Sequence, residues 1–266
     1  MIRDITIGQY YPSNSAIHKL DPRVKLFATL IYIISLFLVK NLLGYIIAIP
    51  AIMIIIYISK VPLKFILRGI KPILFLLIIT VLFNIFFIDG EVIFKIWVIK
   101  ITKEGIRFAV FMAIRLILLI IGTSMMTFTT TANELTDGLE KSLSFLKVLK
   151  IPIHEIAMMM SIALRFIPIL LEEVDKIMKA QTARGAVFDE GSLIKRIKAM
   201  LPILIPLFFS AFRRADDLTM AMEGRCYTCG RNRTKMKPLI YKRQDIIAYL
   251  IIIIYLAIVI GFRWVG

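Results

Sequence analysis

Two short strings decide how this chain is organised: Ala180-Gln181-Thr182-Ala183-Arg184-Gly185 and Ala221-Met222-Glu223-Gly224-Arg225-Cys226. Each string ends a long helical segment with polar flanks, and each places an arginine between small residues. Small neighbours let a partner's backbone approach, and the guanidinium offers five donors in a fixed fork. Arginine followed by glycine is also typical of an ordinary helix end. Because the pattern ends two consecutive long helices, we expect both arginines to contact a partner protein.

The two helices that carry these strings have unusual composition. Pro152 precedes the first, which we expect over residues 153–187, and Ser192 can cap the second, which we expect to end at about Arg225. Internal prolines predict bends at Pro168, Pro202 and Pro206. One half of each helix is apolar and the other is polar. We therefore expect both helices at the inner face of a membrane, with the tips in the cytosol.

The chain as a whole has the composition of a membrane protein. It has 266 residues, of which 59% are hydrophobic, and a formal charge of +16, with a mean hydropathy of +0.84. Long apolar runs of this kind predict transmembrane helices. We expect five spans, with a kink at Pro50 in the second; they cover residues 26–39, 42–59, 72–88, 106–128 and 246–262. The predicted fold class is an all-α integral membrane protein.

The distribution of Lys and Arg predicts the orientation. With a cytosolic N-terminus, twenty-seven of these residues lie inside and six outside, as the positive-inside rule requires. The predicted domains are a cytosolic segment (residues 1–25), four transmembrane helices (26–128), a cytosolic-face domain of one short and two long helices (129–244) and a fifth transmembrane helix (245–266). The C-terminus is then outside.

Local patterns predict several finer features. Asp21 can cap the first span with Pro22 at its first position, and Thr131 with Glu134 fits a capping box that opens a short amphipathic helix, residues 132 to about 145. The β-branched and aromatic residues of 90–102 predict a small hairpin or an interfacial segment.

Two polar side chains fall inside the predicted spans. Asn84 can hydrogen-bond a neighbouring helix, and Arg115 can cap backbone carbonyls or face a partner subunit. Since no Asp or Glu lies in the apolar part of any span, we interpret both as helix-packing residues and not as a substrate relay.

The sequence contains no motif of an enzyme. His18 and His154 are the only histidines, and no phosphate-binding loop is present, so energy from ATP must come from a partner. Cys226 and Cys229 form a C-x-x-C pair without the further ligands of a zinc site, so reduced thiols are expected. The basic residues flank apolar spans, which argues against nucleic acid as a partner.

Ordered blocks along the chain resemble the transmembrane T component of energy-coupling factor (ECF) transporters, the EcfT/CbiQ-like family. The blocks are His18-Lys19-Leu20-Asp21-Pro22-Arg23-Val24-Lys25, Ala113-Ile114-Arg115-Leu116, Thr129-Thr130-Thr131, Leu135-Thr136-Asp137-Gly138-Leu139-Glu140, Leu164-Arg165-Phe166-Ile167-Pro168, Arg214-Ala215-Asp216-Asp217-Leu218 and the two arginine strings, the second extended to Tyr227.

The resemblance implies the function and the partners. Members are subunits of ABC-type importers of vitamins and transition-metal ions in the cell membrane. The resemblance implies that Ala183, Arg184 and Gly185 dock on one of two ABC ATPase subunits and that Gly224, Arg225 and Cys226 dock on the other. ATP and Mg are then bound by those partners, with no cofactor in this chain. The helical domain holds a membrane S component, which binds the substrate.

The chain departs from the family's Ala-Arg-Gly motif at the second string. Gly224 and Cys226 replace alanine and glycine, so small size is kept, but the conformational freedom of a glycine after Arg225 is lost. Two other functions are also considered. A self-contained carrier or membrane enzyme would transport or react without ATPases, and a redox sensor on Cys226 and Cys229 would respond to thiol oxidation.

Overall fold

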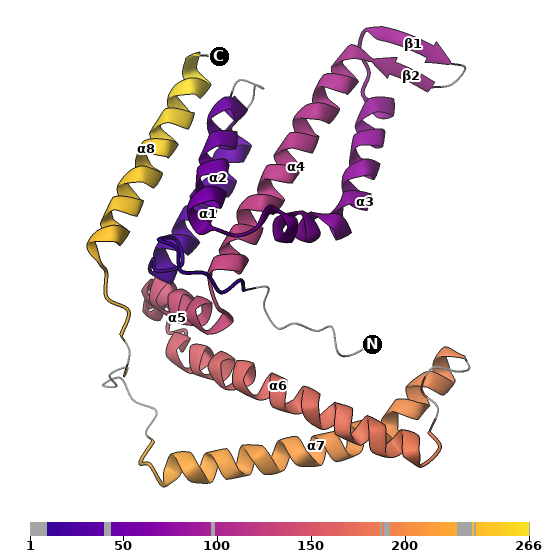
Figure 1. Ribbon diagram of the computed structural model, residues 1–266, viewed down its shortest axis with the longest axis vertical. Helices are drawn as coiled ribbons and strands as arrows, with labels where there is room; N and C mark the ends of the chain where they lie inside the picture. The colour runs from indigo at the N-terminus through magenta and orange to yellow at the C-terminus, as the bar shows by residue number, and fades with distance from the viewer. Residues whose placement is uncertain are drawn as a thin grey trace. The chain divides into compact units, whose positions relative to one another are not determined.

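The structure is a computed structural model that describes residues 10–39, 44–96, 99–186, 188, 192–227, 236 and 238–265 (Figure 1). The chain forms two compact units. The bundle unit comprises Gly8–Ser142 and Leu239–Gly266, and the helix-pair unit comprises Leu143–Pro238. The helix α5 (Ala132–Ser142) belongs to the bundle unit, although the predicted cytosolic-face domain begins at residue 129. The boundaries of the compact units therefore differ from the predicted domain boundaries at 129 and 244, which stay a prediction.

The bundle unit is almost entirely helical. Its helices are α1 (Pro22–Leu38), α2 (Tyr45–Ser59), α3 (Leu63–Phe87), α4 (Lys103–Thr129), α5 (Ala132–Ser142) and α8 (Arg243–Val265). Strands β1 (Val92–Ile96) and β2 (Ile99–Thr102) pair antiparallel between α3 and α4, with a register shift between Val92 and Phe94. Of the two alternatives predicted for this segment, the small hairpin is therefore confirmed, and the protein is an all-α membrane protein with this one small addition among the described residues.

The core of the bundle unit lies around α1 and α4. Helix α1 packs against α4, α5 and α8, and α3 packs along α4. Fully buried Leu36, Tyr45 and Phe128 lie in one apolar cluster. Close approach of α1 and α4 requires Gly122, because a Cβ there would lie 2.5 Å from the ring of Tyr32. Most other apolar side chains of these helices point outward, as membrane-facing residues do.

The helices only partly match the five predicted spans. Helices α4 and α8 are long and apolar enough to cross a membrane, and so is α6 (Ile153–Ala183), which we had placed at the membrane face. Helix α3 qualifies only if its two segments, which are bent by 62° between Lys71 and Ile73, count as one span. The sequence has Pro72 at this position, and proline in an apolar helical run is a common site of bends. Helix α2 has only 15 residues, and positions 40–43, where the predicted spans 26–39 and 42–59 meet, lie outside the described residues.

Three N-caps were predicted, and side-chain hydrogen bonds confirm two of them; Ser192 lies at the N-cap of the helix Leu193–Glu223 but makes no side-chain cap bond. The side chain of Asp21 accepts a hydrogen bond from Arg23 N at 2.9 Å, with Pro22 as the first helical residue. Thr131 Oγ1 accepts from Glu134 N, and Glu134 Oε2 accepts from Thr131 N at 3.0 Å, which completes the capping box. This cap begins α5, which ends at Ser142 and not at about residue 145 as predicted. A 3₁₀ helix, η3 (Leu143–Leu149), follows it.

The two polar residues in the spans have different outcomes. Arg115 donates from Nη2 to the carbonyl of Val39 at 3.0 Å and lies over the ring of Phe111. It therefore caps a backbone carbonyl at the end of α1, which is one of the two roles predicted for it. Asn84 donates to Thr80 O on its own helix, at 2.8 Å. The predicted bond from Asn84 to a neighbouring helix is therefore wrong, because a carbonyl one turn back is already within reach.

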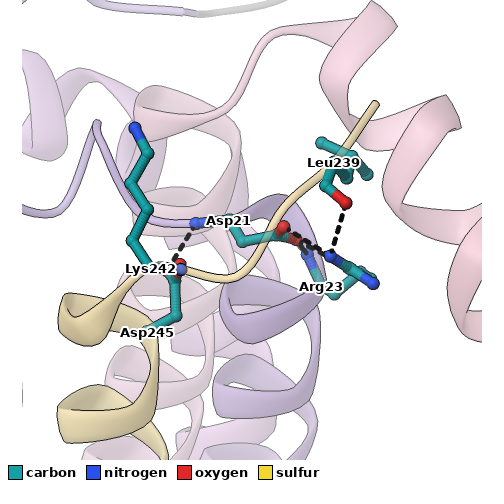
Figure 2. A network of polar contacts seen from close by, with 5 residues as sticks. All are labelled: Asp21, Arg23, Leu239, Lys242 and Asp245. Carbon is teal, nitrogen blue, oxygen red and sulfur yellow. Dashed lines mark hydrogen bonds and ion pairs between the residues drawn. The ribbon is translucent and has the colours of Figure 1, made fainter. Parts of the chain in front are cut away.

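A buried carboxylate joins the two ends of the bundle unit's chain. Asp245, 1% exposed, accepts from Asp21 N at 2.9 Å and from Lys242 N at 2.7 Å (Figure 2). Arg23 forms a two-bond ion pair with Asp21 and also donates to Leu239 O. Burial raises the pKa of Asp21, but the hydrogen bonds and charge of Arg23 outweigh it, and the net shift is downward. The segment that enters α8 is thus fixed to the start of α1.

Candidate functional site

The first candidate site is the end of α6. Gly185, at φ +88°, turns the chain out of the helix. Its N–H donates to Thr182 O at 2.9 Å, and Ala186 N donates to Gln181 O at 3.0 Å. These two bonds define a Schellman motif, in which the residue after the C-cap is left-handed and the next amide reaches back five residues. Arg184 occupies the C-cap. The helix ends at Ala183, four residues before the predicted end, because Gly185 leaves the right-handed region.

The second candidate site is the end of α7 (Leu193–Glu223). Here Cys226 N donates to Glu223 O at 2.8 Å, and Tyr227 N donates to Met222 O at 2.9 Å. Cys226 has φ +53°. The bonds again connect residues three and five apart, so this end is also a Schellman motif, with Arg225 in the position that Arg184 holds in the first.

The two helix ends therefore share one backbone design despite different sequences. The loss of glycine after Arg225 did not change the geometry, because Cys226 adopts the left-handed conformation itself. A side chain with a Cβ pays about 1–2 kcal/mol for that conformation, and glycine does not. Gly224, by contrast, is right-handed at φ −61° and still belongs to the helix turn.

The arginines project freely from these ends. Ala183, Arg184, Gly185, Gly224, Arg225 and Cys226 are all exposed. Neither guanidinium has a hydrogen bond or ion pair to another residue in the part of the chain that the structure describes. An exposed fork at a C-cap, with small residues around it, can donate to carbonyls or carboxylates of a second protein.

Helices α6 and α7 form an antiparallel pair. Arg214 Nη2 on α7 lies 3.1 Å from Glu173 Oε2 on α6, and the hydroxyl of Tyr227 donates to Met158 Sδ at 2.8 Å. Each helix has 31 residues, which corresponds to a length of about 45 Å before bending. Figure 1 shows the change of direction along α7, and Pro202 and Pro206 lie inside this helix. Antiparallel packing places Arg184 and Arg225 at opposite ends of the pair.

Helix α7 also carries an exposed apolar stripe. Its members recur every three or four residues, so they lie on one face of the helix: Ile194, Ile197, Leu201, Ile205, Phe208 and Phe212. Each is at least half exposed, and Phe208 stacks on Phe212. A continuous apolar face of this size is typical of a surface that a partner or a membrane covers.

Among the described residues no group of three or more His, Cys, Asp or Glu side chains is placed to hold a metal ion. Cys226 is an exposed free thiol, and Cys229 lies outside the described residues.

Two residues that close these helix ends were not predicted from the sequence. Ala186 and Tyr227 close the Schellman motifs through their backbone amides, and only the position two residues after each arginine could have indicated them. Asp245 was also missed, although an acidic residue in the first turn of a helix is a known sign of capping.

The family comparison agrees with the geometry. Residues 13–236 match the model of the CbiQ family, described as cobalt transport protein. The chain is 52% identical to the energy-coupling factor transporter transmembrane protein EcfT of Ruminiclostridium cellulolyticum, over 100% of this chain and 99% of that protein. It is also 52% identical to the protein of the same name in Clostridium kluyveri, over all of both chains, and 42% identical to that of Lactococcus lactis, over 95% and 96%.

These matches cover both arginine-ended helices and the bundle unit in one alignment. The chain therefore belongs to the CbiQ/EcfT family, the transmembrane components of energy-coupling factor transporters.

Proposed function

We propose that this protein couples two ABC ATPase subunits to a membrane S component in an importer of vitamins or transition-metal ions. The ATPases bind ATP and Mg and hydrolyse the nucleotide, and this chain transmits their movement without a catalytic group of its own. The protein then resides in the plasma membrane with a cytosolic N-terminus and an outer C-terminus.

The observation that carries this proposal is the pair of matched helix ends. Two exposed arginines in the same backbone setting can enter two equivalent grooves, and their separation by most of a long helix keeps those grooves on separate subunits. Because each arginine lies at the end of a long helix, a displacement of either groove moves the whole helix.

The apolar stripe on α7 supports the second half of the proposal. An S component is itself a membrane protein, so an apolar helix face can pack on it without burying unpaired polar groups. Movement of α7 at Arg225 would then reach the S component through the same helix. The substrate itself is bound by the S component.

The experiment is an affinity pull-down of the chain from its native membrane, followed by mass spectrometry. We expect two ATPases that carry phosphate-binding loops and one small hydrophobic membrane protein. Arg184→Ala and Arg225→Ala are each expected to reduce ATPase recovery by about thirty-fold, as loss of a buried interface arginine does.

Two controls separate docking from general loss of charge. Lys176→Ala on α6 and Arg213→Ala on α7 remove exposed cations far from the helix ends and are expected to leave recovery unchanged. Normal ATPase recovery and uptake in both arginine variants would overturn the proposal. Transport by the purified chain alone would instead support a self-contained carrier.

A further inference from the structure

The bundle unit contains an apolar groove that the proposed function does not use. Its volume is about 640 Å³, within the range of about 300–1,000 Å³ for small-molecule sites. One wall is α2, with Ile54, Ile55 and Ile58, and the opposite wall is α8, with Ile247, Ile251 and Ile258. Parts of α1 and α4 form the floor. Aliphatic walls of this kind suit a flexible hydrocarbon chain.

One end of the groove is polar. Lys25, Thr29 and Gln244 line it there. Their position is fixed, because Asp245 bonds the start of α8 to the start of α1, and Lys25 Nζ bonds Thr129 O at the last turn of α4 at 2.8 Å. This end is therefore the surface at which α1 and α8 begin, and the other end lies deeper in the bundle, at Tyr32 and Tyr255.

The length of the groove matches one leaflet of a bilayer. Along α8 the lining runs from Gln244 to Ile258, which is about 21 Å of helix. Half of a bilayer with its headgroups is also about 20–22 Å. A groove that starts at the membrane surface and ends near the midplane has the dimension of a single lipid.

The polar end also carries a buried positive charge. Lys25 is 6% exposed, and its Nζ donates to two neutral carbonyls, Thr129 O and His18 O. The carboxylates of Glu134, Asp21 and Asp245 attract this charge, but none of them forms an ion pair with it among the residues that the structure describes. Since an ammonium group has three donors, one remains for a ligand. A buried cation at the mouth of an apolar groove complements a phosphate with attached hydrocarbon.

We infer that this groove binds one anionic phospholipid, with an acyl chain between α2 and α8 and the headgroup phosphate at Lys25. The inference concerns the bundle unit alone and does not depend on the ATPases or the S component. The lipid fills a space that α1, α2, α4 and α8 leave open, so it is a structural part of the transmembrane unit.

Native mass spectrometry of the full-length protein, released from detergent containing equal phosphatidylglycerol and phosphatidylcholine, tests the inference. We expect one retained lipid per chain, with phosphatidylglycerol preferred. Lys25→Met should reduce that preference about five-fold, the effect of one cation near a headgroup. Lys25→Arg should keep it, and Lys19→Met, an exposed cation in the same segment, should not change it.

A second pair of variants tests the groove itself. Ala248→Trp places a large ring among the lining residues and should remove the retained lipid whatever its headgroup. Ala257→Trp lies on the same helix at an exposed position outside the lining and should retain it. A thermal melt of each variant shows whether it is folded, and only folded variants are compared.

Three results would overturn the inference. They are the absence of retained lipid from folded wild-type protein, equal retention by the two tryptophan variants, and equal headgroup preference in wild type and Lys25→Met. In the purified complex, photocrosslinks from Ile251 and Ile254 to a partner's helix in place of lipid would also overturn it, with that helix as the occupant.

Discussion

The ends of α6 and α7 show how one backbone geometry can arise from two sequences. The end at Arg184 uses glycine at φ +88°, and the end at Arg225 uses cysteine at φ +53°, yet the same two backbone hydrogen bonds close both. A Cβ added at Gly185 would have nothing within 4 Å. Glycine is therefore present there for its backbone freedom and not for lack of space.

The difference between the two ends lies in what surrounds them. The second end has a tertiary contact, because the hydroxyl of Tyr227 donates to Met158 Sδ on α6. Contacts of this kind can hold a residue in a conformation that its own side chain disfavours. The same arginine setting is thus closed by a left-handed glycine at the first end and by a left-handed cysteine, next to one weak tertiary contact, at the second.

The largest expected effect comes from removing both arginines. If the two ends dock independently, the losses multiply, and the double variant Arg184→Ala/Arg225→Ala should bind ATPases on the order of a thousand-fold more weakly. Binding of the purified ATPases to the chain in nanodiscs measures this. The double variant Lys176→Ala/Arg213→Ala is the control. A double variant no weaker than either single one would show that the ends act as one site.

Valine at the left-handed positions should separate the two ends. Gly185→Val introduces a β-branched side chain at positive φ and should cost about 1–2 kcal/mol of local stability. Cys226→Val should cost less, because Cys226 already bears most of this strain. Hydrogen exchange of the closing amides, Ala186 N–H and Tyr227 N–H, reports each end. Equal protection losses at both ends would contradict the difference in strain.

Glycine in place of the cysteine should improve the second end. Cys226→Gly relieves the left-handed strain but adds freedom to the unfolded chain. We therefore expect slower exchange of Tyr227 N–H, with the free energy of local opening raised by about 0.5–1 kcal/mol. Gly224→Ala is the control, since Gly224 is right-handed and should tolerate a Cβ with little change. Faster exchange in Cys226→Gly would mean that the cysteine side chain stabilises this end.

The smallest effect is expected for Tyr227→Phe. This change removes the hydroxyl that donates to Met158 and keeps the ring, so only a weak bond to sulfur is lost, at about 0.5 kcal/mol. Exchange of Tyr227 N–H should rise slightly, while exchange of Ala186 N–H should stay constant. A change at both ends would indicate that the whole helix pair had moved.

Features set by neighbours in the chain were predictable. The caps by Asp21, Thr131 and Glu134 depend on residues two or three positions away, and the pattern of each is visible in sequence. The carbonyl bond of Arg115 was one of two stated alternatives. The bond of Asn84 was predicted wrongly, because a pattern does not show whether a polar side chain turns to its own helix or to another.

Features set by distant residues were not predictable. The Asp21–Asp245 bond joins positions 224 residues apart, and no local pattern indicates such a contact. The left-handed Cys226 was likewise unexpected, because propensity opposes it and only surrounding structure can impose it. The number of spans also stays a prediction, since α6 is as suitable in length and composition as α4 or α8.

Hydropathy, charge and motif order are properties of the linear chain, and they are enough to identify a helical membrane protein of the CbiQ/EcfT family. The sequence by itself also placed the two arginines at helix ends. The tertiary structure alone decided that both ends adopt one geometry, that a buried aspartate joins α1 to α8, and that a groove lies beside Lys25. These depend on which distant side chains meet, and packing, not local propensity, sets that.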